Sequence, residues 1–442
     1  MKPQMNADER GYEKASQRFV SNRRPTSCIV VHPRASAVLI TVLALSVVMI
    51  GGCRRDAVER DHWSEWRGFD ERHEWGPATV EEAMALIDER DEWTVFPPIN
   101  IPRYPAEKHL AGMVIVIDPG HGGDDGGDID PRTGHKRGPT GAREAHMNLR
   151  VAKLLRRLLT DAGVHVVMTR EGDDSIGLRE RAEIANTVKR LDGGIGADLF
   201  ISIHHNAVGN PQTNYSSVWY HGQVDDAEVA IDAAKYVALE IGREMRTDVA
   251  RTSPLFSDQL MYGTGFGVLR AARVPAFLCE MSFYTNPREE QRLRDAVYNL
   301  REAYAIYVGL CNWAYHGRPT QSLPEVVVDG SQVTLTTTLD EGLPKWWGAD
   351  RPRILSSSVS VRVNGQTVPH EFDRVSKVVT ATLPLSEQEL AEAVVVSIHH
   401  ANMFGNHNYP QRFEVKLPSE GTRATVTPIG PQRAEAQPTA AQ

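Results

Sequence analysis

Short continuous runs of apolar residues alternate, along the middle of this chain, with longer segments whose apolar positions recur at helical spacing. This alternation is typical of an α/β domain, in which helices cover a buried sheet. The apolar runs predict five strands, at residues 114–118, 165–169, 199–204, 217–220 and 276–283. We therefore expect an α/β fold with a mixed, mostly parallel sheet and flanking helices.

The helical periodicity is clearest in residues 144–162, where Met147, Val151 and Leu155 belong to one apolar face. Gly163 follows as the stop signal. Two further helices are expected at residues 178–189 and 226–246. The last helix begins at Asn286-Pro287, a capping residue followed by proline in the first turn, and is predicted to continue to about residue 315.

Residues 324–417 have a different pattern, in which short β-rich runs are separated by Gly, Pro and Asn. The pair Asn364-Gly365 predicts a tight hairpin turn. Several short strands at such spacing favour a small β-sandwich domain of immunoglobulin-like type. The final residues, 418–442, are rich in Pro, Ala, Gln and Thr, and we expect them to be disordered. The predicted strands of this domain are 326–328, 333–339, 359–363, 378–383 and 394–398.

The N-terminal region contains an uncharged apolar run at residues 35–52, preceded by arginines and followed by Cys53. This pattern is typical of an export signal. Residues 50–53 resemble the lipobox of bacterial lipoproteins, which implies a signal peptide over residues 1–53 and lipidation of Cys53. The chain would then be a membrane-anchored lipoprotein in the periplasmic cell envelope. The alternative is an uncleaved membrane anchor, because about 18 apolar residues can span a bilayer. Residues 54–111 are interpreted as a tether with one short helix.

The composition adds limits on size and partners. A chain of 442 residues with a formal net charge of -8 has room for two folded units plus tails. Without a basic surplus, nucleic acid is not expected as a partner. The four cysteines show neither CxxC spacing nor a dense framework, so any metal would be held by histidines and carboxylates. Whether Cys279 and Cys311 pair is left open.

Polar residues of types that bind metals or transfer protons lie at the ends of the predicted elements. Ligands of open α/β sheets bind beyond the carboxyl ends of the strands, so residues there are candidates for a site. Two imidazoles and one carboxylate are a common ligand set for catalytic zinc, and a further carboxylate can then act as general base. The candidates are Asp118, His121, Glu144, His204, His205, Asn206 and Glu280.

Six segments in the same region carry a family resemblance. They are VIVIDPGHGG, EAHMNL, MTREGD, LRERAEIAN, DLFISIHHNA and PAFLCEMSFYTNP. In this order they resemble the catalytic domain of the zinc-dependent N-acetylmuramoyl-L-alanine amidases of bacterial cell walls. The resemblance implies a zinc amidase domain over residues 112–318. It also implies that His121, Glu144 and His204 bind Zn²⁺, and that Glu280 is the catalytic base.

Some candidates remain with two interpretations. Asp118 would either orient His121 or serve as a turn residue. Asn206 is either a substrate donor or a capping residue. His204 and His205 must face opposite sides of their strand, and alternation likewise turns Cys279 away from Glu280. Arg170, Arg179 and Arg181 are expected to form ion pairs with neighbouring glutamates. Residues 396–402, which echo the segment SIHHNA, are interpreted as a coincidence within a strand.

The resemblance implies that the chain hydrolyses the amide bond between the lactyl group of N-acetylmuramic acid and the L-alanine of the peptidoglycan stem peptide. We expect a monomer, attached to the membrane through its lipid anchor. Two alternatives remain open: another zinc amidase or peptidase on the same scaffold, and an inactive wall-binding lipoprotein. The complete set of His121, Glu144, His204 and Glu280 argues against the inactive protein.

Overall fold

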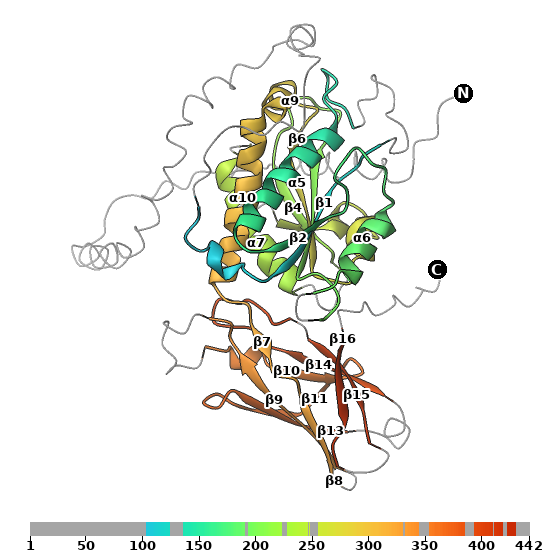
Figure 1. Cartoon of the computed structure of the whole chain (residues 1–442), viewed down its shortest axis with the longest axis vertical. Helices are drawn as coiled ribbons and strands as arrows, with labels where there is room; N and C mark the ends of the chain where they lie inside the picture. The colour runs from blue at the N-terminus through green and yellow to red at the C-terminus, as the bar shows by residue number, and fades with distance from the viewer. Residues whose placement is uncertain are drawn as a thin grey trace, which may run out of the picture.

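Six strands form the central sheet of the first folded unit in this computed structural model (Figure 1). Their order across the sheet is β2-β1-β3-β6-β4-β5. Every neighbouring pair is parallel except β4 and β6, which are antiparallel. The predicted mixed, mostly parallel sheet is therefore confirmed, with β5 as an additional short strand. The strands are β1 (Val114–Pro119), β2 (His165–Met168), β3 (Leu199–Asn206), β4 (Ser217–Tyr220), β5 (Leu255–Ser257) and β6 (Ala276–Phe283).

The structure describes residues 103–123, 136–190, 193–222, 228–245, 247, 255–329, 332–343, 353–384, 393–409, 411–418 and 422–429. The predicted signal peptide, Cys53 and most of the predicted tether lie outside these residues. Within them, no helix combines the length and apolar character needed to cross a membrane.

Helices cover both faces of the sheet. Helices α5 (Glu144–Asp161), α7 (Glu228–Glu244) and α10 (Ala296–Tyr315) share one hydrophobic core with Ile117, Ile203 and Cys279. Helices α6 (Leu178–Thr187) and α8 (Gly267–Ala271) pack against residues such as Val116, Phe200 and Leu278 on the other face. Successive strand residues thus enter different cores, which explains why the strands are almost continuously apolar.

The helix predicted from Asn286 to about residue 315 is two helices, so that prediction was wrong. Helix α9 (Pro287–Arg294) ends before Asp295, whose backbone is extended. The Asp295 side chain accepts a hydrogen bond from the Val297 N–H at 2.7 Å and caps α10. An aspartate at an N-cap satisfies an amide that would otherwise lack a partner, so the break is stabilised locally.

The predicted tether, residues 54–111, includes residues that belong to the α/β unit. Residues 107–109 form a short 3-10 helix, η3 (Glu107–His109). Leu110 is fully buried in the core shared with α5 and α10, and the Tyr104 hydroxyl donates to Asn312 at 2.9 Å. Residues 103–111 therefore belong to the α/β unit, because Leu110 gains apolar burial there.

The second unit is the predicted β-sandwich, and all of its paired strands are antiparallel. One sheet has the order β11-β10-β14-β15-β16, and the other β12-β13-β9-β7 with β8 paired to β9. Asn364 and Gly365 have φ values of 47° and 82°, as a two-residue hairpin turn requires. The strands are β7 (Thr320–Gln321), β8 (Glu325–Asp329), β9 (Gln332–Asp340), β10 (Ser360–Val363), β11 (Gln366–Val368), β12 (His370–Asp373), β13 (Val378–Leu383), β14 (Val394–His399), β15 (Arg412–Lys416) and β16 (Thr425–Ile429), with a 3-10 turn η6 (Ser356–Ser358).

Strand β16 lies in the region predicted to be disordered, so the expected tail of residues 418–442 was wrong for Thr425–Ile429. This strand pairs with β15 along its whole length, and Val426 packs against the sandwich core. The exposed backbone groups of β15 provide hydrogen-bonding partners that the local composition did not reveal. Residues 430–442 lie outside the described part of the chain.

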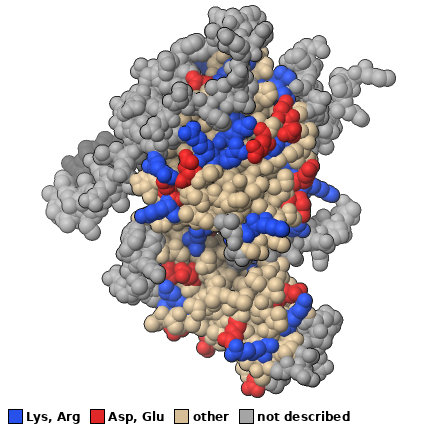
Figure 2. All heavy atoms as spheres, viewed as in Figure 1, with Lys and Arg blue, Asp and Glu red and all other residues tan. Residues whose placement is uncertain are grey.

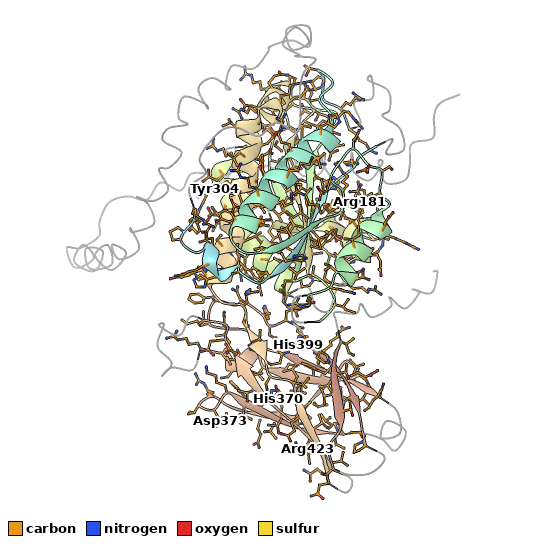
Figure 3. All side chains as sticks on the ribbon, viewed as in Figure 1. Arg181, Tyr304, His370, Asp373, His399 and Arg423 are labelled. Carbon is orange, nitrogen blue, oxygen red and sulfur yellow. The ribbon has the colours of Figure 1, made fainter. Side chains whose placement is uncertain are left out.

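The two units meet through residues 400–408, directly after strand β14. The Asn406 side chain donates to the carbonyls of Trp313 and Gly317 at 3.2 and 2.8 Å, and His407 pairs with Asp232 at 2.9 Å. His399 marks the end of the sandwich nearest to the α/β unit (Figure 3). Within the second SIHHNA-like segment, residues 396–402, the Asn402 side chain also contacts the α/β unit and donates to the His316 carbonyl at 2.8 Å. Helix α9, which follows β6, lies at the opposite end of the α/β unit (Figure 1).

Acidic and basic side chains are interspersed over the face of the molecule shown in Figure 2. This distribution agrees with the small net charge of the chain. Strong, single-sign surface potentials are what a polyanion-binding protein normally presents. On the part of this face that the described residues form, basic side chains lie close to acidic ones.

Candidate active site

The loop after β1 brings His121 to the carboxyl edge of the sheet. His121 has φ of 60°, a left-handed conformation uncommon for a residue with a side chain, and Gly122 and Gly123 continue with positive φ. Gly120 is needed for another reason. A Cβ atom at Gly120 would lie 2.2 Å from two atoms of the His204 ring. The ring therefore occupies space that only glycine leaves free.

Glu144 joins the two imidazoles. As the first residue of α5, it places one carboxylate oxygen 3.1 Å from His121 Nε2 and the other 3.1 Å from His204 Nδ1. The two rings are nearly perpendicular, with centroids 4.8 Å apart. One candidate ligand atom from each of the three residues lies within 4.8 Å of the others. The structure thus brings together residues separated by 83 positions along the chain, from His121 to His204.

The electrostatics of this cluster suit a cation. Burial raises the pKa of Glu144, but the charges and hydrogen bonds of His121 and His204 outweigh it and hold the pKa well below its usual value. Burial lowers the pKa of His204, and this effect outweighs the opposing contacts with Glu144. At neutral pH the carboxylate is therefore charged and the His204 imidazole is neutral, which is the state in which both bind metals. Two imidazole nitrogens and a carboxylate oxygen fit a divalent ion such as zinc.

Glu280 lies beside this cluster without belonging to it. In the sheet it pairs with His204, and its side chain is on the site-facing side of β6. The residue is 9% exposed, and its Oε2 has no hydrogen-bond partner among the described residues. Burial, and then the negative charge of Glu144, raises the pKa of Glu280 well above its usual value. Such a carboxyl group is chemically suited to accept and return a proton.

Cys279 points away from this site, as strand alternation predicted. It is completely buried in the core beneath α5, α7 and α10. Burial, followed by the charge of Glu280, raises the pKa of its thiol. Cys279 and Cys311 are both free, so the open question of their pairing is answered: they form no disulfide. His205 also faces the helices, where its ring contacts Asn148 and Glu302 at 2.7 and 2.9 Å.

Two arginines hold the loop that carries His121. Arg181 forms its ion pair with Asp118 at 2.8 Å, so the expected pairing with a neighbouring glutamate was wrong for Arg181. Arg181 donates to the carbonyls of Pro119 and His121, each at 2.7 Å. Arg170 donates to the carbonyls of Pro119 and Gly120 at 2.9 and 2.8 Å. Buried carbonyls need partners, and these loop carbonyls find them in the two guanidinium groups. Both arginines lie in segments that carry the family resemblance, MTREGD and LRERAEIAN, which was the available signal.

Asp118 acts on His121 through the backbone. Its carboxylate accepts from Thr169, Ser202 and Arg181 at 2.6, 2.7 and 2.8 Å. Although burial raises the pKa of Asp118, Arg181 and the two hydroxyls outweigh burial and lower it. Asp118 lies in β1 rather than in a turn, and it holds the guanidinium that binds the His121 carbonyl.

Asn206 combines a local contact with a spare donor. Its Oδ1 accepts from the N–H of Ala207 at 2.9 Å, the kind of capping contact considered from the sequence. Its Nδ2 is buried and has no partner within the described part of the chain.

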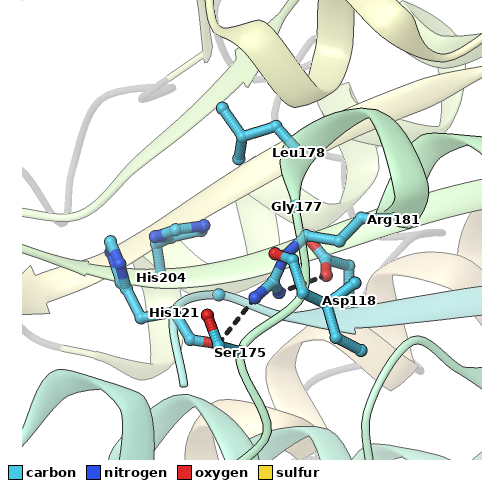
Figure 4. Close-up of a pocket in the computed structure, with 9 residues that line it drawn as sticks. Asp118, His121, Ser175, Gly177, Leu178, Arg181 and His204 are labelled. Atoms are coloured by element: carbon cyan, nitrogen blue, oxygen red, sulfur yellow. Dashed lines mark hydrogen bonds and ion pairs between the residues drawn. The ribbon is translucent and has the colours of Figure 1, made fainter. Parts of the chain in front are cut away.

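A pocket opens next to the two imidazoles (Figure 4). One wall of the pocket comes from the residues that precede and begin α6, including Ser175, Ile176 and Leu178. Leu178 is 55% exposed, so the rim of the pocket carries an accessible apolar side chain. A substrate at His121 and His204 would contact this wall.

Comparisons with known proteins match this same part of the chain. The N-acetylmuramoyl-L-alanine amidase family model matches residues 115–312. The chain is 30% identical over 244 residues to N-acetylmuramoyl-L-alanine amidase AmiA of Escherichia coli K12, covering 47% of this chain and 78% of the relative. It is 28% identical over 211 residues to the germination-specific N-acetylmuramoyl-L-alanine amidase of Bacillus subtilis, covering 46% and 81%.

One similar solved structure is the crystal structure of an N-acetylmuramoyl-L-alanine amidase from Clostridium difficile 630. The sequence identity is 28%, the match covers 46% of this chain and 96% of that chain, and the TM-score is 0.37. The family model ends at residue 312 and leaves the β-sandwich outside.

Proposed function

This chain belongs to the N-acetylmuramoyl-L-alanine amidase family, and on that premise we propose the reaction and the residues that perform it. The chain hydrolyses the amide bond between the lactyl group of N-acetylmuramic acid and the L-alanine of the peptidoglycan stem peptide. The observation that carries this proposal is the cluster of His121, Glu144 and His204, with the buried carboxyl group of Glu280 beside it. We assign the catalytic domain to residues 112–318.

His121, Glu144 and His204 would hold Zn²⁺, since their donor atoms, and the protonation states of Glu144 and His204, fit that ion. When bound, the ion supplies Lewis acidity, which polarises a carbonyl and makes water a better acid. Glu144 contributes one negative charge, so the filled site keeps a net positive charge. That charge favours the negative oxygen that develops during amide hydrolysis.

Glu280 moves the proton. An amide nitrogen is a poor leaving group until it is protonated, so the reaction needs a group that first accepts a proton and later donates it. Because the pKa of Glu280 is raised, it lies closer to neutral pH, where a carboxyl group can both accept and donate a proton. Glu280 keeps 9% of its surface exposed, and its buried Oε2 has no hydrogen-bond partner among the described residues. We assign to Glu280 removal of the water proton and its delivery to the L-alanine nitrogen.

Asp118 and Asn206 have supporting parts in this proposal. Asp118 positions His121 through Arg181 and the loop carbonyls. The buried Nδ2 of Asn206 donates to a carbonyl of the bound stem peptide, because a buried donor without a partner is costly and a substrate would satisfy it.

The cellular setting follows from the substrate. Peptidoglycan lies in the cell envelope, and we propose that the chain is exported there by residues 1–53 and lipidated at Cys53. The apolar run and the residues Ile50, Gly51 and Gly52 before that cysteine support the proposal. We further propose that the protein acts as a monomer. Mass spectrometry of the mature protein tests the anchor, since lipidation predicts a modified N-terminal cysteine, whereas an uncleaved anchor predicts an unmodified Cys53 within the intact chain.

Digestion of purified peptidoglycan tests the reaction. The proposal predicts free L-alanine amino groups and intact glycan strands, and it predicts that a chelator abolishes the release. Cleavage at another bond would indicate a different amidase or peptidase on this scaffold. Binding to the wall without any product would indicate an inactive wall-binding protein.

A further inference from the structure

The turn of residues 136–142 leads directly into α5 and therefore to Glu144. Glu144 is the first residue of that helix, so its N–H has no partner within the helix. The carbonyl of Lys136 supplies the partner, at 2.9 Å. The position of Lys136 consequently affects the backbone of the carboxylate that joins His121 and His204.

Tyr284 holds Lys136 in place. The N–H of Lys136 donates to the Tyr284 hydroxyl oxygen at 2.7 Å. Lys136 has φ of 66°, a conformation that a residue with a side chain adopts only when its surroundings favour it. Tyr284 is 2% exposed, so its ring is fixed by packing. Burial, and then the charge of Glu144, raises the pKa of its hydroxyl group, which agrees with a position close to the site.

Glu290 holds the other half of the same turn. It is fully buried, and its carboxylate accepts from the N–H of Thr140 at 2.9 Å and from the N–H of Ala142 at 3.0 Å. A Cβ atom at Gly138 would lie 2.3 Å from Glu290 Oε1, so the turn and the carboxylate fit closely. Arg294 adds a hydrogen bond to the Thr140 carbonyl at 3.0 Å.

Both Tyr284 and Glu290 follow Glu280 closely along the chain. Tyr284 comes directly after β6, and Glu290 is in the first turn of α9. The segment that follows Glu280 along the chain therefore contacts the turn that precedes Glu144. These contacts connect the end of β6 and the start of α9 with the turn before Glu144, which is distant in the sequence.

We propose that Tyr284 and Glu290 are positioning residues, which hold the turn of residues 136–142 and so set the place of Glu144 between the two imidazoles. This inference rests on the proposed function only in assuming that the site binds a cation. It does not depend on which bond the chain cleaves. Glu144 contacts each imidazole at 3.1 Å, so a small displacement of its backbone weakens the cation site. Residues that orient ligands typically affect metal affinity by about 10- to 100-fold.

The test compares Tyr284→Phe and Glu290→Gln with two matched controls in the full chain. Tyr298→Phe removes an equally buried hydroxyl, which donates to Glu289 at 2.8 Å. Glu289→Gln changes the neighbouring, fully buried carboxylate, which contacts Asn214 and Arg292. None of these control contacts involves the turn.

Two measurements are made on each variant. Competition with a chromophoric chelator gives the affinity for Zn²⁺, and we expect about a tenfold loss in Tyr284→Phe and Glu290→Gln with no change in the controls. Hydrogen-deuterium exchange on peptides covering residues 137–146 reports the turn itself, without dependence on a metal. We expect faster exchange there only in Tyr284→Phe and Glu290→Gln, which we call the clamp variants because these two residues hold the turn. Thermal unfolding verifies that each variant is folded.

The outcomes separate this inference from the proposed function. Clamp variants with the affinity and exchange of the controls would overturn the inference, and so would equal losses in all four variants. If Glu290→Gln did not fold, Tyr284→Phe would decide. A wild-type chain that binds Zn²⁺ but releases no L-alanine amino groups would refute the proposed reaction, but not the inference about Tyr284 and Glu290. A wild-type chain without affinity for Zn²⁺ would overturn both.

Discussion

Replacement of Gly120 by alanine tests how tightly the site is packed around His204. The added Cβ would lie 2.2 Å from His204 Cε1 and Nε2, whereas carbon atoms in contact prefer about 3.5 to 4.0 Å. The ring must therefore move by roughly 1 Å or more. Its hydrogen-bonding contact with Glu144 is 3.1 Å and does not tolerate such a shift. Gly120 has no positive φ, so the clash is the only penalty of alanine at this position.

Two magnitudes follow. Overpacking of this kind costs about 1–3 kcal/mol of stability, so Gly120→Ala should still fold. Misplacement of a reacting group by about 1 Å reduces the rate about 10²-fold, so we expect that loss in kcat/KM.

Release of L-alanine amino groups from purified peptidoglycan measures the loss, and thermal unfolding measures the stability. Gly209→Ala is the matched control, because that glycine follows β3, has no positive φ and has no atom within 4 Å of an added Cβ. Full activity of Gly120→Ala would refute the argument that His204 needs the space above Gly120.

Three further predictions concern other residues. Glu280→Ala should retain zinc and lose at least about 10²-fold in activity, and survival of activity in wall digests would exclude Glu280 as the base. His121→Ala should lose zinc, so a normal zinc content by elemental analysis would exclude His121 as a ligand. Burial lowers the pKa of His407, but its hydrogen bond and ion pair with Asp232 outweigh burial and raise it above 6.5. The stabilisation is then complete below about pH 6.5 and is lost as the pH rises through the raised value, because the charged form is the one that the fold favours. The difference in thermal unfolding temperature between wild type and His407→Gln should shrink above that pH, and a constant difference would contradict this sign.

The local sequence pattern was sufficient to predict those elements whose formation depends mainly on the residues within them. Apolar runs predicted β4 and β6 at their observed bounds, and period 2 placed His204 and His205 on opposite faces of β3. Asn364-Gly365 predicted a hairpin turn because only residues that tolerate positive φ fit there. Each of these inferences concerns a preference that a short segment carries by itself.

The tertiary structure decided what depends on distant partners. Strand β16 forms because β15 has a free edge, and α9 and α10 separate at Asp295 although the apolar pattern continues. Periodicity could not show that Tyr284 and Glu290 hold the turn before Glu144, about 150 residues earlier in the case of Glu290. The sequence alone therefore indicated the strands and helices that carry the site and, through resemblance, the candidate chemistry. The fold determined which side chains meet, because hydrogen bonds and packing between remote segments leave no local repeat.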